Sequence, residues 1–258
     1  MVPVEDTALA VTDTRGPGVP VVYLNGQFAS QRHWRRVIAE LGPDWRHVTY
    51  DERARGRSKR SADYSFEANV RDVDAILEAR GVDRPLLMGW SYGAVVAVHW
   101  ADRNPDLVAG VVAVDGAYPL DSYWAGDAAA ERIRKLWRRW RLLLPLVSRL
   151  GLGGARMSAD QHAESNIELN KICAAIVPVL DGVTVPVRYV VASGEAMGSS
   201  GDDHERMRAA LEPHLARNPN ITVGARVASN HAQILRKDFR AVADAVRQLA
   251  ATHDGEVA

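Results

Sequence analysis

The sequence predicts an α/β protein with a mostly parallel central sheet flanked by helices and an inserted helical cap. Short runs rich in β-branched residues alternate with longer segments of helical periodicity, as in successive βαβ units. Residues 118–180 interrupt this alternation with helical patterns alone. In addition, a Gly-Trp-Ser-Tyr-Gly segment stands between a predicted strand and a predicted helix.

Each predicted strand is a run of mainly apolar residues, and each predicted helix carries apolar residues on one face. The expected strands are 19–24, 46–50, 85–88, 108–114, 185–192 and 221–227. The expected helices are 31–41, 66–80, 92–104, 203–217 and 237–251. We also expect residues 9–14 to form an antiparallel edge hairpin with residues 19–24, because Arg15-Gly16-Pro17-Gly18 is typical of a turn.

The interruption divides the expected fold into two parts. Residues 1–117 and 181–258 would form the core domain, and residues 118–180 would form the cap. In the cap, one helical face is apolar and the opposite face is rich in arginine. The apolar face carries Ile133, Leu136, Trp137, Trp140 and Leu144. We interpret this segment as a helix laid over the sheet rather than on a membrane, because the chain as a whole is neutral.

Composition excludes several classes of protein. With 47% apolar and 25% charged residues, the chain has an ordinary globular composition. Its 32 basic and 32 acidic residues give no excess of positive charge for coating nucleic acid. Cys173 stands alone, which fits a reducing compartment. Without a signal sequence or an apolar membrane segment, we expect a soluble cytoplasmic monomer or homodimer with no nucleic-acid or membrane partner.

The Gly89-Trp90-Ser91-Tyr92-Gly93 segment carries the strongest chemical signal. Its place between a strand and a helix is the context of a nucleophile elbow. A serine hydroxyl is a weak nucleophile until a sharp turn exposes it and a neighbouring base activates it. Small residues on both sides allow such a turn, and the helix N-terminus presents N–H groups to a developing negative charge. We therefore expect Ser91 to be a nucleophile.

From about Gly16 to Leu249, the chain resembles the α/β-hydrolase fold family. That family orders its triad as nucleophile, acid and histidine, and it carries a helical cap after the sixth strand, where residues 118–180 lie. Asn25-Gly26-Gln27 looks like the family's His-Gly-x oxyanion turn, with Asn25 in place of histidine. Residues 51–58, DERARGRS, are similar to its D-x-R-G-x-G-x-S loop, with Ala54 in place of a glycine.

The resemblance implies a basic histidine on the loop after the last strand, and His231 is the histidine on that loop. The acid has two candidate positions. Asp115 ends the strand 108–114, where haloalkane dehalogenases and some lactone hydrolases of this family place it. The more usual loop, residues 193–203, offers Glu195, Asp202 and Asp203, although either aspartate also fits an N-cap. We favour Asp115, because an aspartate that ends a buried strand needs a reason to be there.

The resemblance further implies an oxyanion hole formed by the backbone N–H groups of Gln27 and Tyr92. The Gln27 side chain could also contact substrate. The cap is rich in tryptophan and leucine, so we expect it to cover an apolar pocket. The expected substrate contacts are Gly26, Trp90, Trp137 and Trp140.

These features predict a serine hydrolase that cleaves a small hydrophobic ester or lactone through a Ser-His-Asp triad. Neither a metal nor another cofactor is expected, because the chain has no H-E-x-x-H motif and no G-x-G-x-x-G motif after a strand. A carbon–carbon bond hydrolase, a metabolite-tailoring enzyme and a non-catalytic ligand-binding protein on the same fold are the alternatives. Haloalkane and epoxide chemistry uses a carboxylate nucleophile in this fold, so Ser91 disfavours both.

Overall fold

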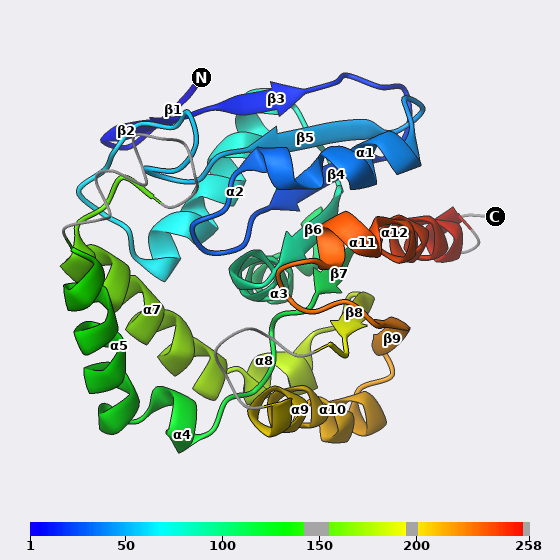
Figure 1. Cartoon of the computed structure of the whole chain (residues 1–258). Helices are drawn as coiled ribbons and strands as arrows, with labels where there is room; N and C mark the ends of the chain where they lie inside the picture. Colours follow the sequence, from blue (N-terminus) through cyan, green and yellow to red (C-terminus); the bar gives the residue numbers. More distant parts are fainter. Residues whose placement is uncertain (142–154, 195–200, 255–258) are drawn as a thin grey trace.

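The computed structural model describes residues 1–141, 155–194 and 201–254, and a seven-stranded sheet lies at its centre (Figure 1). The strand order is β3-β5-β4-β6-β7-β8-β9; β3 and β5 are antiparallel, and the other neighbours are parallel. Its strands are β3 (Val11–Asp13), β4 (Pro20–Leu24), β5 (Arg46–Tyr50), β6 (Leu86–Trp90), β7 (Gly110–Val114), β8 (Val187–Ala192) and β9 (Ile221–Val227). β1 (Val2–Val4) and β2 (Thr7–Leu9) form a separate two-stranded sheet. The α/β-hydrolase fold expected from the sequence is confirmed.

Helices cover both faces of this sheet, and more helices follow β7. The first half of the chain contains η1 (Gln31–Trp34), α1 (Arg35–Leu41), α2 (Phe66–Arg80), α3 (Tyr92–Arg103) and η2 (Pro105–Leu107). Between β7 and β8 lie α4 (Ser122–Ala125), α5 (Asp127–Trp140), α7 (Ala159–Ala174) and α8 (Val177–Gly182). The last part contains α9 (Gly201–Ala209), α10 (Glu212–Arg217), α11 (Ile234–Lys237) and α12 (Phe239–Asp254).

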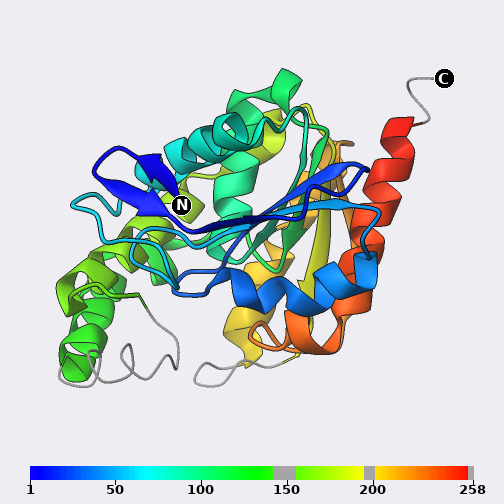
Figure 2. The same ribbon diagram turned by 90° about the horizontal axis from the view of Figure 1, so that it is seen from above.

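Side chains of the central strands alternate between two apolar cores. In β4, Val22 and Leu24 pack into the core shared with α2, α3 and α8. Val21 and Tyr23 of the same strand pack into the core shared with α1, α11 and α12. Figure 2 shows these two groups of helices on opposite sides of the sheet. A strand buried on both faces has a continuous apolar sequence, which is why the sequence pattern locates these strands well.

The expected hairpin between residues 9–14 and 19–24 is wrong. β3 pairs with β5, with Val11 opposite Tyr50, and β5 separates β3 from β4. The loop at residues 15–18 therefore crosses over the chain that leads into β5 instead of turning back on β3. A Cβ at Gly16 would overlap the carbonyl oxygens of Pro43 and Trp45, which shows how closely the two segments approach. β4 is apolar on both faces, so it is better buried between two parallel neighbours than at the edge.

The helix expected over residues 203–217 is divided into α9 and α10. Pro213 lies in the first turn of α10. Proline is tolerated in a first turn but disrupts a helix interior, so one continuous helix is disfavoured here. α9 contributes Arg208 and Met207 to the site described below.

The interval expected to form a cap is helical, and no strand occurs in its described residues. Figure 1 shows α5 and α7 side by side, and Arg134 of α5 pairs with Glu164 of α7 at 2.9 Å. The expected apolar face of α5 is only partly covered, because Leu136 and Trp140 are 52% and 48% exposed. Leu144 lies outside the described residues. Among the helices that the structure describes, none is both long and apolar enough to cross a membrane.

Candidate active site

Ser91 lies in a strained turn between β6 and α3. Its φ is +56° and its ψ is −115°, a backbone conformation that residues with a Cβ rarely adopt. The turn packs so tightly that a Cβ at Gly93 would overlap the Leu24 carbonyl oxygen, and one at Gly116 would overlap the Ser91 backbone. The Ser91 N–H donates to the Val114 carbonyl at 3.0 Å. These constraints fix the hydroxyl at the carboxyl end of the sheet.

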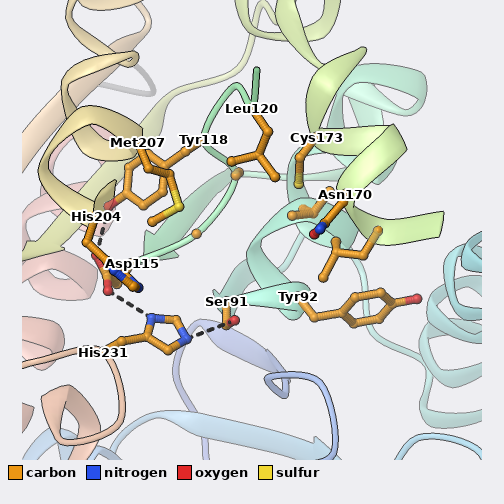
Figure 3. Close-up of a pocket in the computed structure, with 14 residues that line it drawn as sticks. Ser91, Tyr92, Asp115, Tyr118, Leu120, Asn170, Cys173, His204, Met207 and His231 are labelled. Carbon is orange, nitrogen blue, oxygen red and sulfur yellow. Dashed lines mark hydrogen bonds and ion pairs between the residues drawn. The ribbon is translucent and has the colours of Figure 1, made fainter. Parts of the chain in front are cut away.

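The structure brings Ser91, His231 and Asp115 together (Figure 3). His231 Nε2 lies 3.0 Å from Ser91 Oγ, and His231 Nδ1 lies 2.8 Å from Asp115 Oδ2. The three residues follow β6, β9 and β7, whose carboxyl ends meet at one edge of the parallel sheet. This geometry is that of a nucleophile, a general base and an acid that orients the base.

Asp115 is held more tightly than the contact with His231 alone would require. Its side chain is fully buried, and its Oδ1 accepts hydrogen bonds from Ala192 N at 3.1 Å and Tyr118 Oη at 2.9 Å. Arg208 of α9 contacts both carboxylate oxygens, with Nε 3.3 Å from Oδ1 and Nη2 3.4 Å from Oδ2. Burial alone would raise the pKa of Asp115, but His231 and Arg208 more than offset burial and hold the pKa below its usual range. Asp115 is therefore an anion fixed in one orientation.

The alternative acids do not take this position in the described structure. Asp203 accepts from Arg206 at 2.5 Å and from the Tyr123 hydroxyl at 3.4 Å. His231 Nδ1 instead contacts Asp115. Glu195 and the side chain of Asp202 lie outside the described residues.

One expected oxyanion donor belongs to the elbow, and the other follows the strand next to it. Tyr92 is the first residue of α3, directly after Ser91, and Gln27 follows β4, the parallel neighbour of β6. The Gln27 side chain donates from Nε2 to Ser165 Oγ at 3.0 Å, so it links this turn to α7. The oxyanion role of the two backbone N–H groups stays a prediction.

Asn25, which replaces the histidine usual in the family, is a buried hydrogen-bonding centre. Its Nδ2 donates to the Tyr50 carbonyl and to Glu52, while its Oδ1 accepts from the Trp34 indole at 2.8 Å. Its N–H also donates to Glu52. Burial raises the pKa of Glu52 to about 7, although Arg55 and these hydrogen bonds oppose the shift. An amide at position 25 can donate and accept at once, so it satisfies this buried network.

A mainly apolar pocket of about 180 Å³ opens beside Ser91 and His231. The core and the interval between β7 and β8 both contribute to its wall (Figure 3). The side chains that surround it include Tyr118, Leu120, Leu169, Cys173, His204 and Met207. None of these six residues was predicted to line the site, although Leu169 and Cys173 have the i, i+4 spacing of one helical face.

The expected substrate contacts lie elsewhere in the described structure. Trp90 packs between His33 and His231, with ring centroids 5.7 and 5.5 Å away. Gly26 lies against the Trp90 ring, where a Cβ would overlap it. Trp137 packs on Phe28, and Trp140 is largely exposed. None of these four expected residues lines the described pocket beside Ser91.

In residues 1–141, 155–194 and 201–254, no group of three or more His, Cys, Asp or Glu side chains could hold a metal ion.

The contact between Arg208 and Asp115 predicts a measurable pH effect. Arg208→Gln is expected to move the acidic limb of the kcat/KM profile upward by about one pH unit. The guanidinium helps to hold the pKa of Asp115 below its usual range, so its removal raises that pKa and the carboxylate is lost at a higher pH. His204 faces the same group, and burial together with the charges of Arg208 and His231 lowers the pKa of His204. Initial rates across the pH range would measure the shift.

Arg206→Gln is the matched control for this prediction. Arg206 lies on the same helix and has the same charge, but it is 65% exposed and pairs with Asp203. The control should leave the acidic limb in place. Equal shifts in both variants would contradict a specific effect through Asp115.

The fold and site together define a class of protein. Residues 19–147 match the family described as alpha/beta hydrolase fold, and the chain belongs to that family. The nucleophile elbow and the helices after β7 are the family features inferred above from the sequence.

Individual relatives have several activities. A haloalkane dehalogenase of Mesorhizobium japonicum is 29% identical over 141 residues, which cover 54% of this chain and 45% of that relative. Lipase LipV of Mycobacterium tuberculosis is 34% identical over 108 residues, 41% of each chain. The matches thus span less than half the length of these relatives. The structure is also similar to that of a thermophilic esterase from Thermogutta terrifontis, with a TM-score of 0.73 and 19% sequence identity. The match covers 96% of this chain and 94% of the esterase chain, so the two proteins share a fold.

Proposed function

We propose that this α/β-hydrolase is a serine hydrolase that cleaves a small hydrophobic ester or lactone. One observation carries the proposal: a continuous hydrogen-bonded chain from Ser91 through His231 to Asp115 ends beside an apolar pocket. Such a chain activates a serine, and the pocket provides a place for an acyl group.

In the proposed mechanism, Ser91 Oγ attacks the carbonyl carbon while His231 Nε2 accepts its proton. Asp115 stabilises the imidazolium through Nδ1, and the N–H groups of Gln27 and Tyr92 bind the oxyanion. When the intermediate collapses, the bond to the leaving group breaks and His231 returns the proton to it. Water, activated by the same histidine, then cleaves the acyl-enzyme and regenerates the serine.

The pocket dimensions favour a short acyl group. Its volume of about 180 Å³ lies below that of most pockets for drug-sized ligands, which start at roughly 300 Å³. An apolar cavity of about 150 Å³ is large enough to bind benzene. Butyrate-sized or benzoate-sized acyl groups therefore fit better than long fatty acyl chains.

The nucleophile separates this proposal from the activities of some relatives. Haloalkane and epoxide chemistry in this fold uses a carboxylate, whereas this elbow carries Ser91. Carbon–carbon bond hydrolysis could use the same triad, and a tailoring reaction could use the pocket without the serine. A non-catalytic binding protein has no need for a hydrogen-bonded triad, so the geometry favours an enzyme. The cytoplasmic location and the oligomeric state stay predictions from the sequence.

A fluorophosphonate probe tests whether Ser91 is activated. Intact-mass spectrometry of the wild-type protein should show one adduct, of the probe mass less HF, because a serine that a base deprotonates attacks phosphorus and displaces fluoride. Ser91→Ala and His231→Ala should both lose the adduct. Hydrolysis of p-nitrophenyl esters of increasing chain length would then define the acyl preference.

The labelling experiment can also overturn the proposal. Circular dichroism should show that both variants are folded. An unlabelled wild-type protein with a native spectrum, or labelling that persists in Ser91→Ala, would contradict the assignment of the nucleophile. Turnover of a metabolite that survives Ser91→Ala would instead favour the tailoring reaction.

A further inference from the structure

A second pocket, of about 340 Å³, lies near the elbow. It is distinct from the apolar pocket beside Ser91 and His231, which we call the acyl pocket. The second pocket is formed by the segment from η1 into α1, the end of β6 and the start of α11, and Figure 2 shows α1 and α11 side by side. We call it the arginine pocket, because Arg32, Arg35, Arg36 and Arg236 line it. His33 adds a fifth nitrogen-bearing side chain, and no acidic residue contributes to its wall.

The four arginines of the arginine pocket are solvent-exposed, and the Arg36 guanidinium donates to the Arg236 carbonyl at 2.8 Å, but none of them pairs with a nearby carboxylate of the described residues. Among the described residues, no ion pair within 4.0 Å joins a carboxylate to any of its four guanidinium groups. The nearby acid of α1, Glu40, pairs instead with Arg240 and Arg247. The chain has equal numbers of basic and acidic residues, so this cluster does not follow from composition. Like charges around one cavity repel each other and attract an anion.

Trp90 provides a second, independent observation. Its indole lines the arginine pocket, and its Nε1 is buried without a hydrogen-bond partner in the described residues. Buried N–H groups are nearly always paired in folded proteins, because an unpaired donor is costly. Nε1 has almost no accessible surface in this structure, so a ligand in the arginine pocket could pair with it only after the indole shifts.

The triad lines the acyl pocket, and residues next to it in the chain line the arginine pocket. Ser91 and His231 line the acyl pocket, while their chain neighbours Trp90 and Ala232 line the arginine pocket. His231 must deliver its proton to the leaving group, so the leaving group lies near this histidine during the reaction. A substrate could therefore place its acyl group in one pocket and its leaving group in the other.

We propose that the arginine pocket binds a phosphate-bearing leaving group, which rests on the serine hydrolase function proposed above. The substrate class is an acyl ester or thioester whose alcohol or thiol carries one or more phosphates. Four guanidinium groups suit the several charges and oxygens of phosphate better than a single carboxylate. In the reaction, Ser91 Oγ bonds to the acyl carbon, the bond to the alcohol oxygen or thiol sulfur breaks, and His231 protonates that atom. Water then releases the acid.

Binding is tested first, with inorganic pyrophosphate as the probe. Titration calorimetry should show binding to the wild type and to Ser91→Ala alike. The double variant Arg32→Gln/Arg35→Gln should bind about tenfold more weakly or worse, because it loses charge-assisted hydrogen bonds. Arg71→Gln/Arg103→Gln removes the same charge from exposed positions on α2 and α3 and should leave binding unchanged. Equal weakening in both double variants, or no binding to the wild type, would overturn the site.

A pair of thioesters with one acyl group then tests the leaving-group role. The wild type should hydrolyse butyryl-coenzyme A with a kcat/KM about tenfold above that of S-butyryl-N-acetylcysteamine, which lacks phosphates. The ratio should fall to near one in Arg32→Gln/Arg35→Gln and persist in Arg71→Gln/Arg103→Gln. Equal rates in the wild type, with Ser91 still labelled by the fluorophosphonate, would overturn this inference and leave the proposed function standing. Hydrolysis of neither thioester together with an unlabelled Ser91 would overturn both.

Discussion

Replacing Ser91 with alanine is expected to lower kcat for p-nitrophenyl butyrate by about a million-fold, the loss typical when a triad nucleophile is removed. Only its hydroxyl oxygen can form the acyl-enzyme, and that oxygen lies 3.0 Å from His231 Nε2. Alanine occupies the same strained backbone position as serine, so the fold should be retained. Initial rates, with thermal unfolding as the check on folding, would measure the effect.

His231→Ala and the double variant make this test specific. A nucleophile and its base act as one unit, so removal of both should cost little more than removal of either. If the losses multiply instead, the two residues act independently and the proposed chain of proton transfer is wrong. A Ser91→Ala variant that keeps more than about one-tenth of wild-type activity would likewise contradict the mechanism, since residual catalysis without the triad is far weaker.

Local sequence signals were sufficient to predict that Ser91 and His231 belong to one site, and the structure places the two side chains in contact. The strand before Ser91 is apolar, the residues beside it are small, and a helix follows directly. His231 was identified by its position after the last strand, which parallel topology places at the same sheet edge. Both inferences depend on chain order and periodicity, which are visible without coordinates.

Features that depend on contacts between distant segments were harder to predict. The prediction of an edge hairpin is wrong although Arg15-Gly16-Pro17-Gly18 is a suitable turn in isolation. Residues 15–18 pack against residues 43–45 instead, and the chain crosses β5 before it forms β4. Arg208 reaches Asp115 from a helix 93 positions later in the chain, and no motif marks that contact. The arginine pocket likewise joins two helix starts that are far apart in the sequence.

The acid of the triad was open between two positions because each has a local explanation. A strand end and a helix start both accommodate an aspartate, so the sequence pattern favours Asp115 only weakly. The structure adds five hydrogen bonds to Asp115, from His231, Tyr118, Ala192 and twice from Arg208. That environment predicts unequal effects of substitution at the two positions.

Asp115→Asn is accordingly expected to lower kcat by about ten-thousand-fold, whereas Asp203→Asn should change it by no more than a few-fold. An asparagine that keeps the shape of Asp115 can no longer stabilise the imidazolium, and its amide can hold His231 in the wrong tautomer. The hydrogen bonds from Ser91 to His231 and from His231 to Asp115 do not involve Asp203, so its substitution leaves them in place. Steady-state kinetics on the same ester would compare the two variants.

The free energy of unfolding of Asp115→Asn has to be measured alongside its kinetics. Asp115 also compensates the charge of Arg208, whose side chain is only 9% exposed. Removing the carboxylate leaves that guanidinium unpaired, which commonly costs about 3–5 kcal/mol of folding free energy. The double variant Asp115→Asn/Arg208→Gln should recover part of that stability and none of the activity. Recovery of activity in the double variant, or a larger kinetic loss in Asp203→Asn than in Asp115→Asn, would contradict the assignment of Asp115 as the acid.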